Sequence, residues 1–431
     1  MLGSYIKHDG WSTYDIDKFN SATHKSMAIQ NIFVNFNINW NNLYVQTSNI
    51  VSRGATPMIS LMPKGSRNAD TLAAIAAGEE DVFLHSWISS FKAWRESYPE
   101  EQRPVILLRF GHEFNGNWYP WGNRPEAFKA AWRHVHAMFE AAGANDGVEW
   151  VWCASATDVD DYRDIRVYYP GDDVVDWTGL DGYNWGNNYS WSSWRNFDQV
   201  FSYAYNRLVQ NYPEKPIVLA EVASAEPGDQ PDPSWGQFGN DNDANESKDA
   251  WVADMMNRIE DSYPAIRAIT WFNNNKEVSW ALNETAKSGY PNTGLTGYNQ
   301  GIQSDHFKSD FTRLGFDFPE QQAALSTQQR VAQSPAPANF YMKLLDILIA
   351  TAHAKQVDVP GKAKGKGKDK SEKLTKKQLK EKLTGLQRAL AVSKKPKTVG
   401  KALRDEQAKG MKKMPKKYLK KIAESRMQLG E

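Results

Sequence analysis

Two glutamates stand where a carboxylate is seldom found without a function or a partner. Glu113 lies in the stretch RFGHEFNGNWYP at 109–120, directly after the apolar run PVILL, and Glu221 ends the apolar stretch PIVLAE. Burying a carboxylate beside apolar residues is costly unless the group is paired or used. Two opposed carboxyl groups with unlike pKa values can hydrolyse a glycosidic bond, because one protonates the leaving oxygen while the other attacks the anomeric carbon. A salt bridge or a helix cap is the alternative interpretation of such a pair.

Aromatic side chains accompany these carboxylates. Trp118 and Trp121 follow Glu113 closely in the chain. Indole rings stack on the faces of sugars, so this composition favours carbohydrate chemistry over a structural ion pair. Core packing is the alternative for Trp118 and Trp121. Three further tryptophans follow the run at 175–183, where they could line outer sugar subsites or merely cover the fold: Trp185, Trp191 and Trp194.

These residues need a scaffold that brings distant strand ends together. Eight apolar runs alternate with stretches of helical spacing, and the runs lie at 2–6, 28–36, 55–61, 104–110, 148–154, 175–183, 216–223 and 266–273. Runs this rich in Val, Ile, Leu and aromatic residues are typical of strands that are buried on both faces. The stretches at 71–97, 124–143 and 247–263 have helical spacing.

The alternation of runs and helical stretches predicts a (β/α)8 TIM barrel, whose active sites lie at the carboxyl ends of the strands. Glu113 would then follow the fourth strand and Glu221 would end the seventh, which faces the fourth across the barrel mouth. An open doubly wound sheet is the alternative, but no glycine-rich phosphate loop follows the first run.

The stretch RFGHEFNGNWYPWG resembles the signature of glycoside hydrolase family 26, in which Arg-x-x-His-Glu-x-Asn-Gly closes the fourth strand. The resemblance continues through DWTGLDGYNW, PIVLAEVAS and ITWFN, and covers residues 1–300 approximately. It implies a retaining, endo-acting glycoside hydrolase that cleaves internal β-linkages of a polysaccharide by double displacement. It also implies that the reaction needs no metal and no other cofactor.

The resemblance assigns roles to residues around the nucleophile. Glu113 would be the general acid/base, and Glu221 would be the nucleophile. Arg109 would keep the nucleophile ionised, as its fixed charge allows, and Tyr183 would hydrogen-bond it. Asp181 would support the site from the sixth strand, although a simple ion pair between Arg109 and Asp181 is the alternative.

The resemblance also implies contacts with the substrate. His112 would hydrogen-bond the nucleophile or the sugar just before the scissile bond, and Trp271 would form the platform under that sugar. Trp118 would lie at the next subsite, and Trp121 belongs to the same substrate-binding and supporting set. Mannanases of the family usually carry Trp-Phe-Trp-Trp where this chain has WYPW at 118–121. The central Tyr-Pro pair of this stretch is more similar to the glucanase and xylanase branches of the family.

The choice of sugar depends on hydrogen bonds to single hydroxyl groups, which a sequence does not position. We therefore expect mixed-linkage β-1,3-1,4-glucan or β-1,4-mannan as the substrate, with β-1,3-xylan behind both. A non-catalytic carbohydrate-binding barrel within a larger assembly is the alternative function.

Charge divides the chain into two kinds of polypeptide. Residues 361–431 contain 24 Lys and Arg against 7 Asp and Glu, whereas the remainder contains 28 against 44. We predict a catalytic barrel at 1–300, a helical extension that packs on it at 301–355, and a Lys-rich linker and partly disordered tail at 356–431. A solvated tail is the simplest expectation for 361–431, and a polyanion is the natural partner if it binds anything.

The remaining expectations concern location and other ligands. No stretch approaches about 18 continuous apolar residues, so we expect no membrane span, and no signal peptide is visible. The implied activity predicts an extracellular or surface-associated monomer whose partner is its polysaccharide.

Cys153, the single cysteine, lies in VEWVWCAS, where a buried inert thiol is expected. His134 and His136 would point to different faces of a helix and 239–247 lacks the spacing of a calcium loop, so no metal site is expected.

Overall fold

The computed structural model describes residues 1–63, 71–158, 164–227, 233–236, 246–286 and 292–313. Eight parallel strands close into a barrel in chain order, with the last strand paired to the first. The strands are β1 (Leu2–Ile6), β2 (Ile29–Asn35), β3 (Thr56–Met62), β4 (Ile106–Phe110), β5 (Val148–Ser155), β6 (Trp177–Asn184), β7 (Ile217–Ser224) and β8 (Ile266–Asn273). Each predicted run overlaps one of these strands, so the prediction of a TIM barrel is confirmed.

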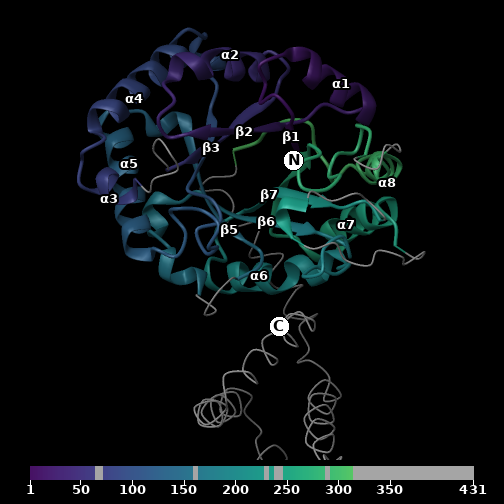
Figure 1. Ribbon diagram of the computed structural model, residues 1–431. Coiled ribbons are helices and arrows are strands. Elements are labelled where there is room, and N and C mark those ends of the chain that lie inside the picture. Colours follow the sequence, from purple (N-terminus) through teal and green to yellow (C-terminus); the bar gives the residue numbers. More distant parts are fainter. Residues whose placement is uncertain (64–70, 159–163, 228–232, 237–245, 287–291, 314–431) are drawn as a thin grey trace, which may run out of the picture. The chain divides into compact units, whose positions relative to one another are not determined.

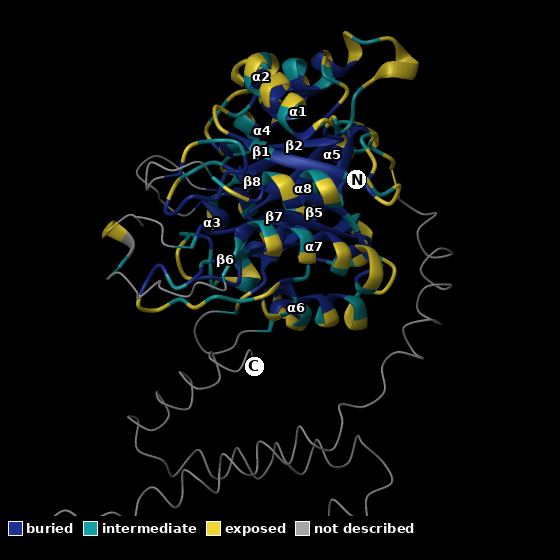
Figure 2. Cartoon of the chain, turned by 90° about the vertical axis from the view of Figure 1, so that its right-hand side faces the viewer, coloured by how far each residue is buried: buried dark blue, intermediate teal, exposed yellow. Residues whose placement is uncertain are grey.

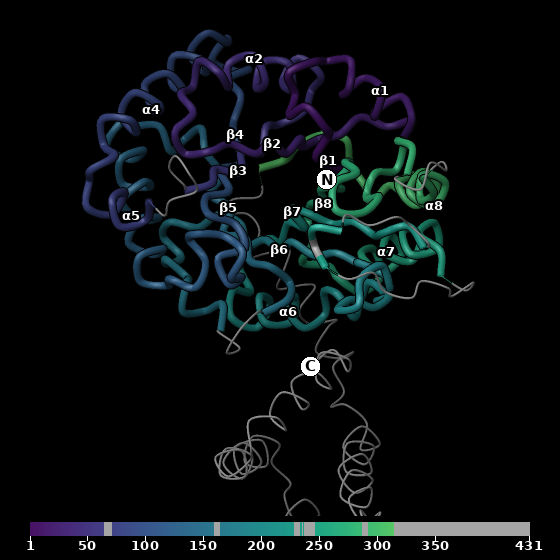
Figure 3. Tube along the Cα trace, in the orientation of Figure 1, coloured from purple at the N-terminus to yellow at the C-terminus, as the bar shows by residue number. Residues whose placement is uncertain are grey.

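Helices surround the strands as a ring (Figure 1), and the chain passes once around the barrel so that β8 returns beside β1 (Figure 3). The α-helices are α1 (Thr13–Thr23), α2 (Trp40–Val51), α3 (Leu72–Ala76), α4 (Asp81–Glu96), α5 (Pro125–Ala141), α6 (Phe197–Asn211), α7 (Lys248–Ser262) and α8 (Leu295–Gly301). The short 3-10 helices are η2 (Glu100–Gln102), η3 (Asn145–Gly147), η4 (Ile165–Tyr168), η5 (Asp172–Val174) and η6 (Pro233–Trp235). Among the helices that the structure describes, none has both the length and the apolar character needed to cross a membrane.

One helical stretch differs from its prediction. The stretch at 71–97 forms two helices, α3 and α4, rather than one. Gly78 lies between them with a φ of +79°, a left-handed conformation that an α-helix cannot contain and that glycine adopts at little cost. The apolar residues keep helical spacing on both sides of Gly78, so the spacing alone did not predict that the helix is interrupted there.

The strands are buried on both faces, as their continuous apolar sequences predict (Figure 2). The outer faces pack against the helices, while a separate apolar cluster fills the inside of the barrel. The inner cluster consists of Ala28, Ile29, Met58, Leu107, Val151, Cys153, Trp177, Val218, Ala220 and Ala268. Because this plug fills the inside, the polar residues at the carboxyl ends of the strands lie on a packed support.

Residues 302–313 pack against the amino-terminal end of the barrel. The amide of Leu2 donates to the carbonyl of Lys308 at 2.8 Å, and Arg313 donates to the carbonyl of Asp146 at 2.7 Å. Arg313 also pairs with Glu149, a carboxylate that is only 2% exposed. The contacts of the barrel thus extend past residue 300. The rest of the predicted helical extension and the whole basic tail, at 314–431, lie outside the described residues.

Candidate active site

The carboxyl ends of β4, β6 and β7 bring four of the predicted residues together. Arg109 is fully buried and donates to both oxygens of Asp181, at 2.7 and 2.6 Å. Its other terminal nitrogen donates to Oε1 of Glu221 at 2.5 Å. The hydroxyl of Tyr183 donates to Oε2 of Glu221. One cation and one hydroxyl therefore hold both oxygens of Glu221 and fix its orientation.

A β-bulge directs Glu221 into the barrel. Leu180 pairs with Leu219, but the next residue of β6, Asp181, pairs with Glu221, so Ala220 is an additional residue in β7. Ala220 belongs to the cluster inside the barrel. Because side chains alternate along a strand, the residue after Ala220 would face the helices if the strand were regular. The bulge restores the inward direction at Glu221, a use of bulges that is common beside active sites.

Arg109 is itself held from β2 and β3. Its Nε donates to the hydroxyl of Ser60 at 2.8 Å, and Ser60 donates to Oδ1 of Asn31 at 2.6 Å. The guanidinium carbon lies 5.5 Å from the centre of the Phe33 ring. Although burial opposes the charge, Asp181 and Glu221 hold the pKa of Arg109 well above its ordinary value. The arginine is therefore a fixed cation that positions two carboxylates.

Cys153 lies under this network. Its thiol donates to Oδ1 of Asp181 at 3.2 Å, and Nη1 of Arg109 approaches the sulfur at 3.7 Å. Burial raises the pKa of the thiol well above its ordinary value. The buried thiol that the sequence predicts is present, and it also contacts Asp181 and Arg109.

Glu113 belongs to a different setting, the turn after β4. The residue has a φ of +53°, and its amide donates to the carbonyl of Cys153 at 3.0 Å, which fixes this strained conformation. Its Oε2 accepts a hydrogen bond from the indole of Trp118 at 2.6 Å. Burial, followed by the charge of Glu221, raises the pKa of Glu113 to about 8. Glu113 is thus protonated at neutral pH.

The aromatic residues after Glu113 form one side of the site. Trp118 is 42% exposed, so a face of its ring is open to a ligand. Tyr119 stacks on Trp121 with ring centres 4.3 Å apart, and its hydroxyl lies 3.2 Å from Nε2 of His112. Trp121 is fully buried and donates to the carbonyl of His112 at 2.8 Å. Trp121 therefore supports the site from below, in agreement with core packing, and it presents no face to a substrate.

The prediction that Trp271 forms a platform under a sugar is wrong. Trp271 is fully buried, lies against Trp251 of α7 and Tyr298 of α8, and donates to the carbonyl of Trp280 at 3.1 Å. The next residue, Phe272, points into the barrel and stacks on Tyr5 with ring centres 4.7 Å apart. The correction follows from the alternation of β8, because Phe272 occupies the inward position and Trp271 the outward one.

Sequence reasoning missed the aromatic residues on the β1, β2 and β8 side of the mouth. Tyr5 contacts Phe33 edge-on at 4.9 Å and stacks on Phe272, which lies 5.9 Å from the ring of Tyr183. Each of these residues lies in an apolar run, where an aromatic side chain is expected to belong to the hydrophobic core. Their inward positions in the alternation are the signal that could have found them. We call Tyr5, Phe33 and Phe272 the aromatic floor.

The structure also distinguishes among the tryptophans after β6. Trp191 is 53% exposed and stacks on Tyr189 with ring centres 5.2 Å apart. Trp185 lies between Trp191 and the fully buried Trp280, at 5.1 and 4.8 Å. Trp194 is half-buried. Of these, Trp191 offers the most open ring, whereas Trp185 mainly packs.

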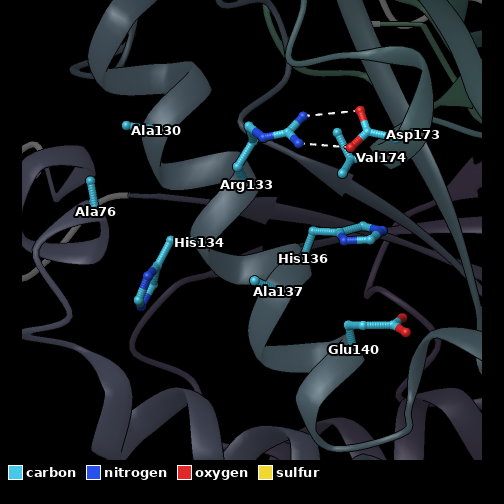
Figure 4. Close-up of a pocket in the computed structure, with 9 residues that line it drawn as sticks. All are labelled: Ala76, Ala130, Arg133, His134, His136, Ala137, Glu140, Asp173 and Val174. Carbon is cyan, nitrogen blue, oxygen red and sulfur yellow. Dashed lines mark hydrogen bonds and ion pairs between the residues drawn. The ribbon is translucent and has the colours of Figure 1, made fainter.

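A separate surface cavity of about 520 Å³ lies on the outer wall of the barrel, between α5, α3 and η5 (Figure 4). In Figure 4, His134 and His136 project from α5 in different directions. Nε2 of His134 lies 2.6 Å from Asp81, and the ring of His136 packs against Trp150 at 5.0 Å. These histidines share no ligand position. In the described part of the chain, no cluster of three or more His, Cys, Asp or Glu side chains could hold a metal ion.

Replacing Trp118 by phenylalanine is expected to raise the pKa of Glu113 by about one unit, because a hydrogen bond to a charged carboxylate stabilises the charged form by about that much. The pKa can be measured by NMR titration of protein labelled with carbon-13 in its glutamate carboxyl groups. Trp191→Phe is the matched control, since Trp191 is also exposed. An unchanged titration of Glu113 in Trp118→Phe would contradict the contact.

Comparison with known proteins places these residues in a family context. Residues 63–253 match the model described as Glycosyl hydrolase family 26. Endoglucanase H of Acetivibrio thermocellus is 32% identical over 317 residues, which cover 70% of this chain and 31% of that protein. A Beta-1,3-xylanase of Alcaligenes sp. is 25% identical over 196 residues, covering 44% of this chain and 39% of the relative.

A Mannan endo-1,4-beta-mannosidase of Bacillus subtilis is 26% identical over 205 residues, 45% of this chain and 46% of that protein. This chain therefore spans less than half the length of each of these relatives. Among solved structures, GH26C from Muricauda sp. superposes with a TM-score of 0.50 at 13% identity, covering 73% of this chain and 88% of that one. At this identity the superposition is informative about the fold alone.

Proposed function

This chain belongs to glycosyl hydrolase family 26, and from that premise we propose that it is a retaining, endo-acting glycoside hydrolase of a β-linked polysaccharide. One observation carries the proposal. Two carboxyl groups share the barrel mouth in opposite settings, Glu221 held by Arg109 and Tyr183, and Glu113 with its pKa raised by burial to about 8. Double displacement at an anomeric carbon uses such a pair.

In the first step, Glu221 attacks the anomeric carbon and the bond to the leaving oxygen breaks. The proton of Glu113 passes to that oxygen, so the departing chain leaves as a neutral alcohol. Arg109 and Tyr183 hold the attacking carboxylate in place while its charge is consumed. The product of this step is an ester between Glu221 and the sugar.

In the second step, the same two residues exchange roles. Glu113, now a carboxylate, takes a proton from water as the oxygen of that water attacks the anomeric carbon. The ester bond breaks, and Glu221 leaves as a carboxylate that Arg109 again neutralises. Two successive inversions return the original configuration at the anomeric carbon, which is the meaning of retention.

Trp118 has a second part in this scheme. Its indole donates to Oε2 of Glu113, so the transferable proton of Glu113 resides on Oε1. The exposed face of the same ring can stack on the sugar of the leaving group. Trp191, exposed on the β6 side, is the corresponding candidate for an outer sugar. Asp181, Ser60 and Cys153 act by holding Arg109.

For the substrate, we propose mixed-linkage β-1,3-1,4-glucan first and β-1,4-mannan second. The relative named as an endoglucanase is similar over a longer part of this chain and at higher identity than the relative named as a mannosidase. The WYPW stretch at 118–121 supports the same order. β-1,3-Xylan remains the third candidate, supported by the xylanase relative.

The test compares these polymers directly. We expect reducing sugar to be released from mixed-linkage glucan, with a rapid fall in viscosity because internal bonds are cut, and less from mannan and β-1,3-xylan. Proton NMR of the first products reports their anomeric form, and retention predicts that the β-anomer appears first. A folded protein that cleaves none of the three polymers contradicts the proposed function. Appearance of the α-anomer first contradicts only the retaining mechanism.

We further propose that the protein acts outside the cell or at its surface, because the polymers in question are met there. Contact between the basic residues 361–431 and a polyanion stays a prediction from charge alone. The monomeric state also stays a prediction.

A further inference from the structure

The turn directly after β1 is strained. His8, Asp9 and Gly10 have φ values of +71°, +47° and +75° in succession. For a residue other than glycine, this left-handed conformation costs on the order of 1 kcal/mol. Two such residues in a row at the mouth of a barrel call for an explanation, because strain of this kind gathers at functional sites. We call residues 8–10 the left-handed turn.

Side chains of α2 hold the left-handed turn in place. Gln46 donates through Nε2 to the carbonyl of Asp9 at 2.7 Å, and Asn49 donates through Nδ2 to the carbonyl of Gly10 at 3.0 Å. Gly10 is buried against Ile50, which leaves little room for a side chain at that position. The backbone on both sides of the Asp9 side chain is therefore fixed, and so is the direction of its carboxylate.

The carboxylate of Asp9 lies over the aromatic floor. Its Oδ1 accepts a hydrogen bond from the amide of Phe33 at 3.3 Å, and the hydroxyl of Tyr5 donates to it. Tyr5 stacks on Phe272, and Phe33 lies under Arg109. Burial, then the charges of Asp9 and Glu221, raise the pKa of Tyr5.

Asp9 and Tyr5 both keep part of their surface open to solvent. The amide of Phe33 alone does not account for the left-handed turn, because a residue in an ordinary conformation can cap one amide at the end of a strand. An accessible carboxylate beside aromatic rings has the groups that a sugar requires. Carboxylate oxygens accept from sugar hydroxyls in charge-assisted hydrogen bonds, and the rings contact the apolar faces of the pyranose.

We propose that Asp9 is a substrate-contacting carboxylate, presented by the left-handed turn and oriented by Tyr5, which binds hydroxyl groups of a sugar beside the one attacked by Glu221. The proposal rests on the proposed function of the site. Asp9 takes no part in bond cleavage, because Glu113 and Glu221 supply both carboxyl groups that the reaction needs. It adds a third carboxylate to the mouth, on the β1 side, whose role is to bind.

The test measures binding in protein that cannot turn over its ligand. In a Glu221→Ala background, with and without Asp9→Asn, a mixed-linkage glucan hexasaccharide and mannohexaose are titrated by calorimetry. Asparagine keeps the shape of aspartate and can still accept from the amide of Phe33, but it lacks the charge. We expect Asp9→Asn to weaken binding of the preferred hexasaccharide about tenfold, the effect of losing one charge-assisted hydrogen bond.

Two further variants separate binding from folding. Asp15→Asn removes a carboxylate from the first turn of α1, where it contacts His8, and should leave the affinity unchanged. Tyr5→Phe keeps the stacked ring, removes the hydroxyl that orients Asp9 and should weaken binding about threefold, a modest part of one hydrogen bond. Melting temperatures of all variants are compared with the Glu221→Ala parent.

Equal affinities with and without Asp9→Asn would overturn the inference, as would the absence of any binding of either hexasaccharide to the parent. Loss of affinity in Asp9→Asn with an unchanged melting temperature supports it. If Asp9→Asn lowers the melting temperature, the Tyr5→Phe result decides. The proposed function is tested separately by hydrolysis in the wild-type protein, so either idea can fail while the other stands.

Discussion

Replacing Glu221 by alanine is expected to lower kcat by about 10⁴-fold or more on every β-glycan that the wild-type protein hydrolyses, because a catalytic nucleophile has no substitute within reach. The reason lies in the geometry of the site. Both oxygens of Glu221 are held, one by Arg109 and the other by Tyr183, so the group is fixed for attack in one direction. Initial rates of reducing-sugar release measure the effect.

The control for this variant is Glu126→Ala, which removes a glutamate whose side chain is 84% exposed on α5 and should leave kcat unchanged. Chemical rescue gives a sharper result. Azide can occupy the space left by the carboxylate and attack an activated aryl glycoside, which produces an α-glycosyl azide by a single inversion. Near-normal turnover of Glu221→Ala, or rescue without inversion, would exclude Glu221 as the nucleophile.

Folding of this variant must be checked, since Arg109 loses one of its partners. Removing one partner of a buried ion pair can destabilise a protein by about 3–5 kcal/mol. Asp181 still receives two hydrogen bonds from Arg109, so the cation is not left unpaired. We therefore expect a smaller loss of stability for Glu221→Ala than for a variant that removes Asp181.

The sequence predicted the barrel well because its signal is physical and repeated. Strands buried on both faces need continuous apolar runs, and each of the eight runs overlaps a strand of the barrel. The same signal placed Glu113 and Glu221 at strand ends, and only the closed barrel brings them to one mouth. Chain order and strand ends were sufficient for that result.

The predictions from sequence were wrong where a shift of one residue along a strand decides which side chain faces the inside of the barrel. Trp271 and Phe272 are neighbours in an apolar run, and only the alternation of the folded strand determines which of them enters the mouth. In a regular strand, Glu221 would face the helices. The additional residue Ala220 shifts the alternation, so Glu221 faces the inside of the barrel. A bulge of this kind depends on pairing with the neighbouring strand, which local sequence does not display.

Polar residues inside apolar runs were the other omission. Asn31 and Ser60 each interrupt a run that otherwise reads as core, and they support Arg109 across two strands. Asp9 follows β1 in a stretch that suggests an ordinary turn, and its placement depends on side chains of α2. Such residues acquire their importance from partners that are distant in sequence, so inspection of one segment does not find them.

The second large effect concerns pH and Glu113. Since the pKa of Glu113 is raised to about 8, its proton is available below that pH and is lost above it. We expect kcat/KM for a polysaccharide to fall as the pH rises through about 8, because the leaving oxygen then departs without a proton. Glu113→Gln should lower kcat/KM on the polymer about 10³-fold, within the usual contribution of general acid catalysis.

Aryl glycosides provide the contrast. A nitrophenolate leaves without protonation, so the first step on such a substrate should change little in Glu113→Gln and should lose its dependence on pH near 8. The nucleophile Glu221 is unchanged in this variant and still forms the ester. Equal losses on the polymer and on the aryl glycoside would contradict the assignment of Glu113 as the acid.

The same pKa makes a prediction about stability that is independent of any substrate. The ordinary carboxyl pKa is 4.5 and that of Glu113 in the folded protein is about 8, so between these values the folded state binds the proton more tightly than the unfolded state. The stabilisation is therefore complete below about pH 4.5 and is lost as the pH rises through about 8. Glu113→Gln carries no titrating group, so the difference in melting temperature between wild type and this variant should change over that window and become constant above it. If the pH above which the difference in melting temperature becomes constant disagrees with the midpoint of the kinetic limb, the limb belongs to another group and Glu113 is not the acid.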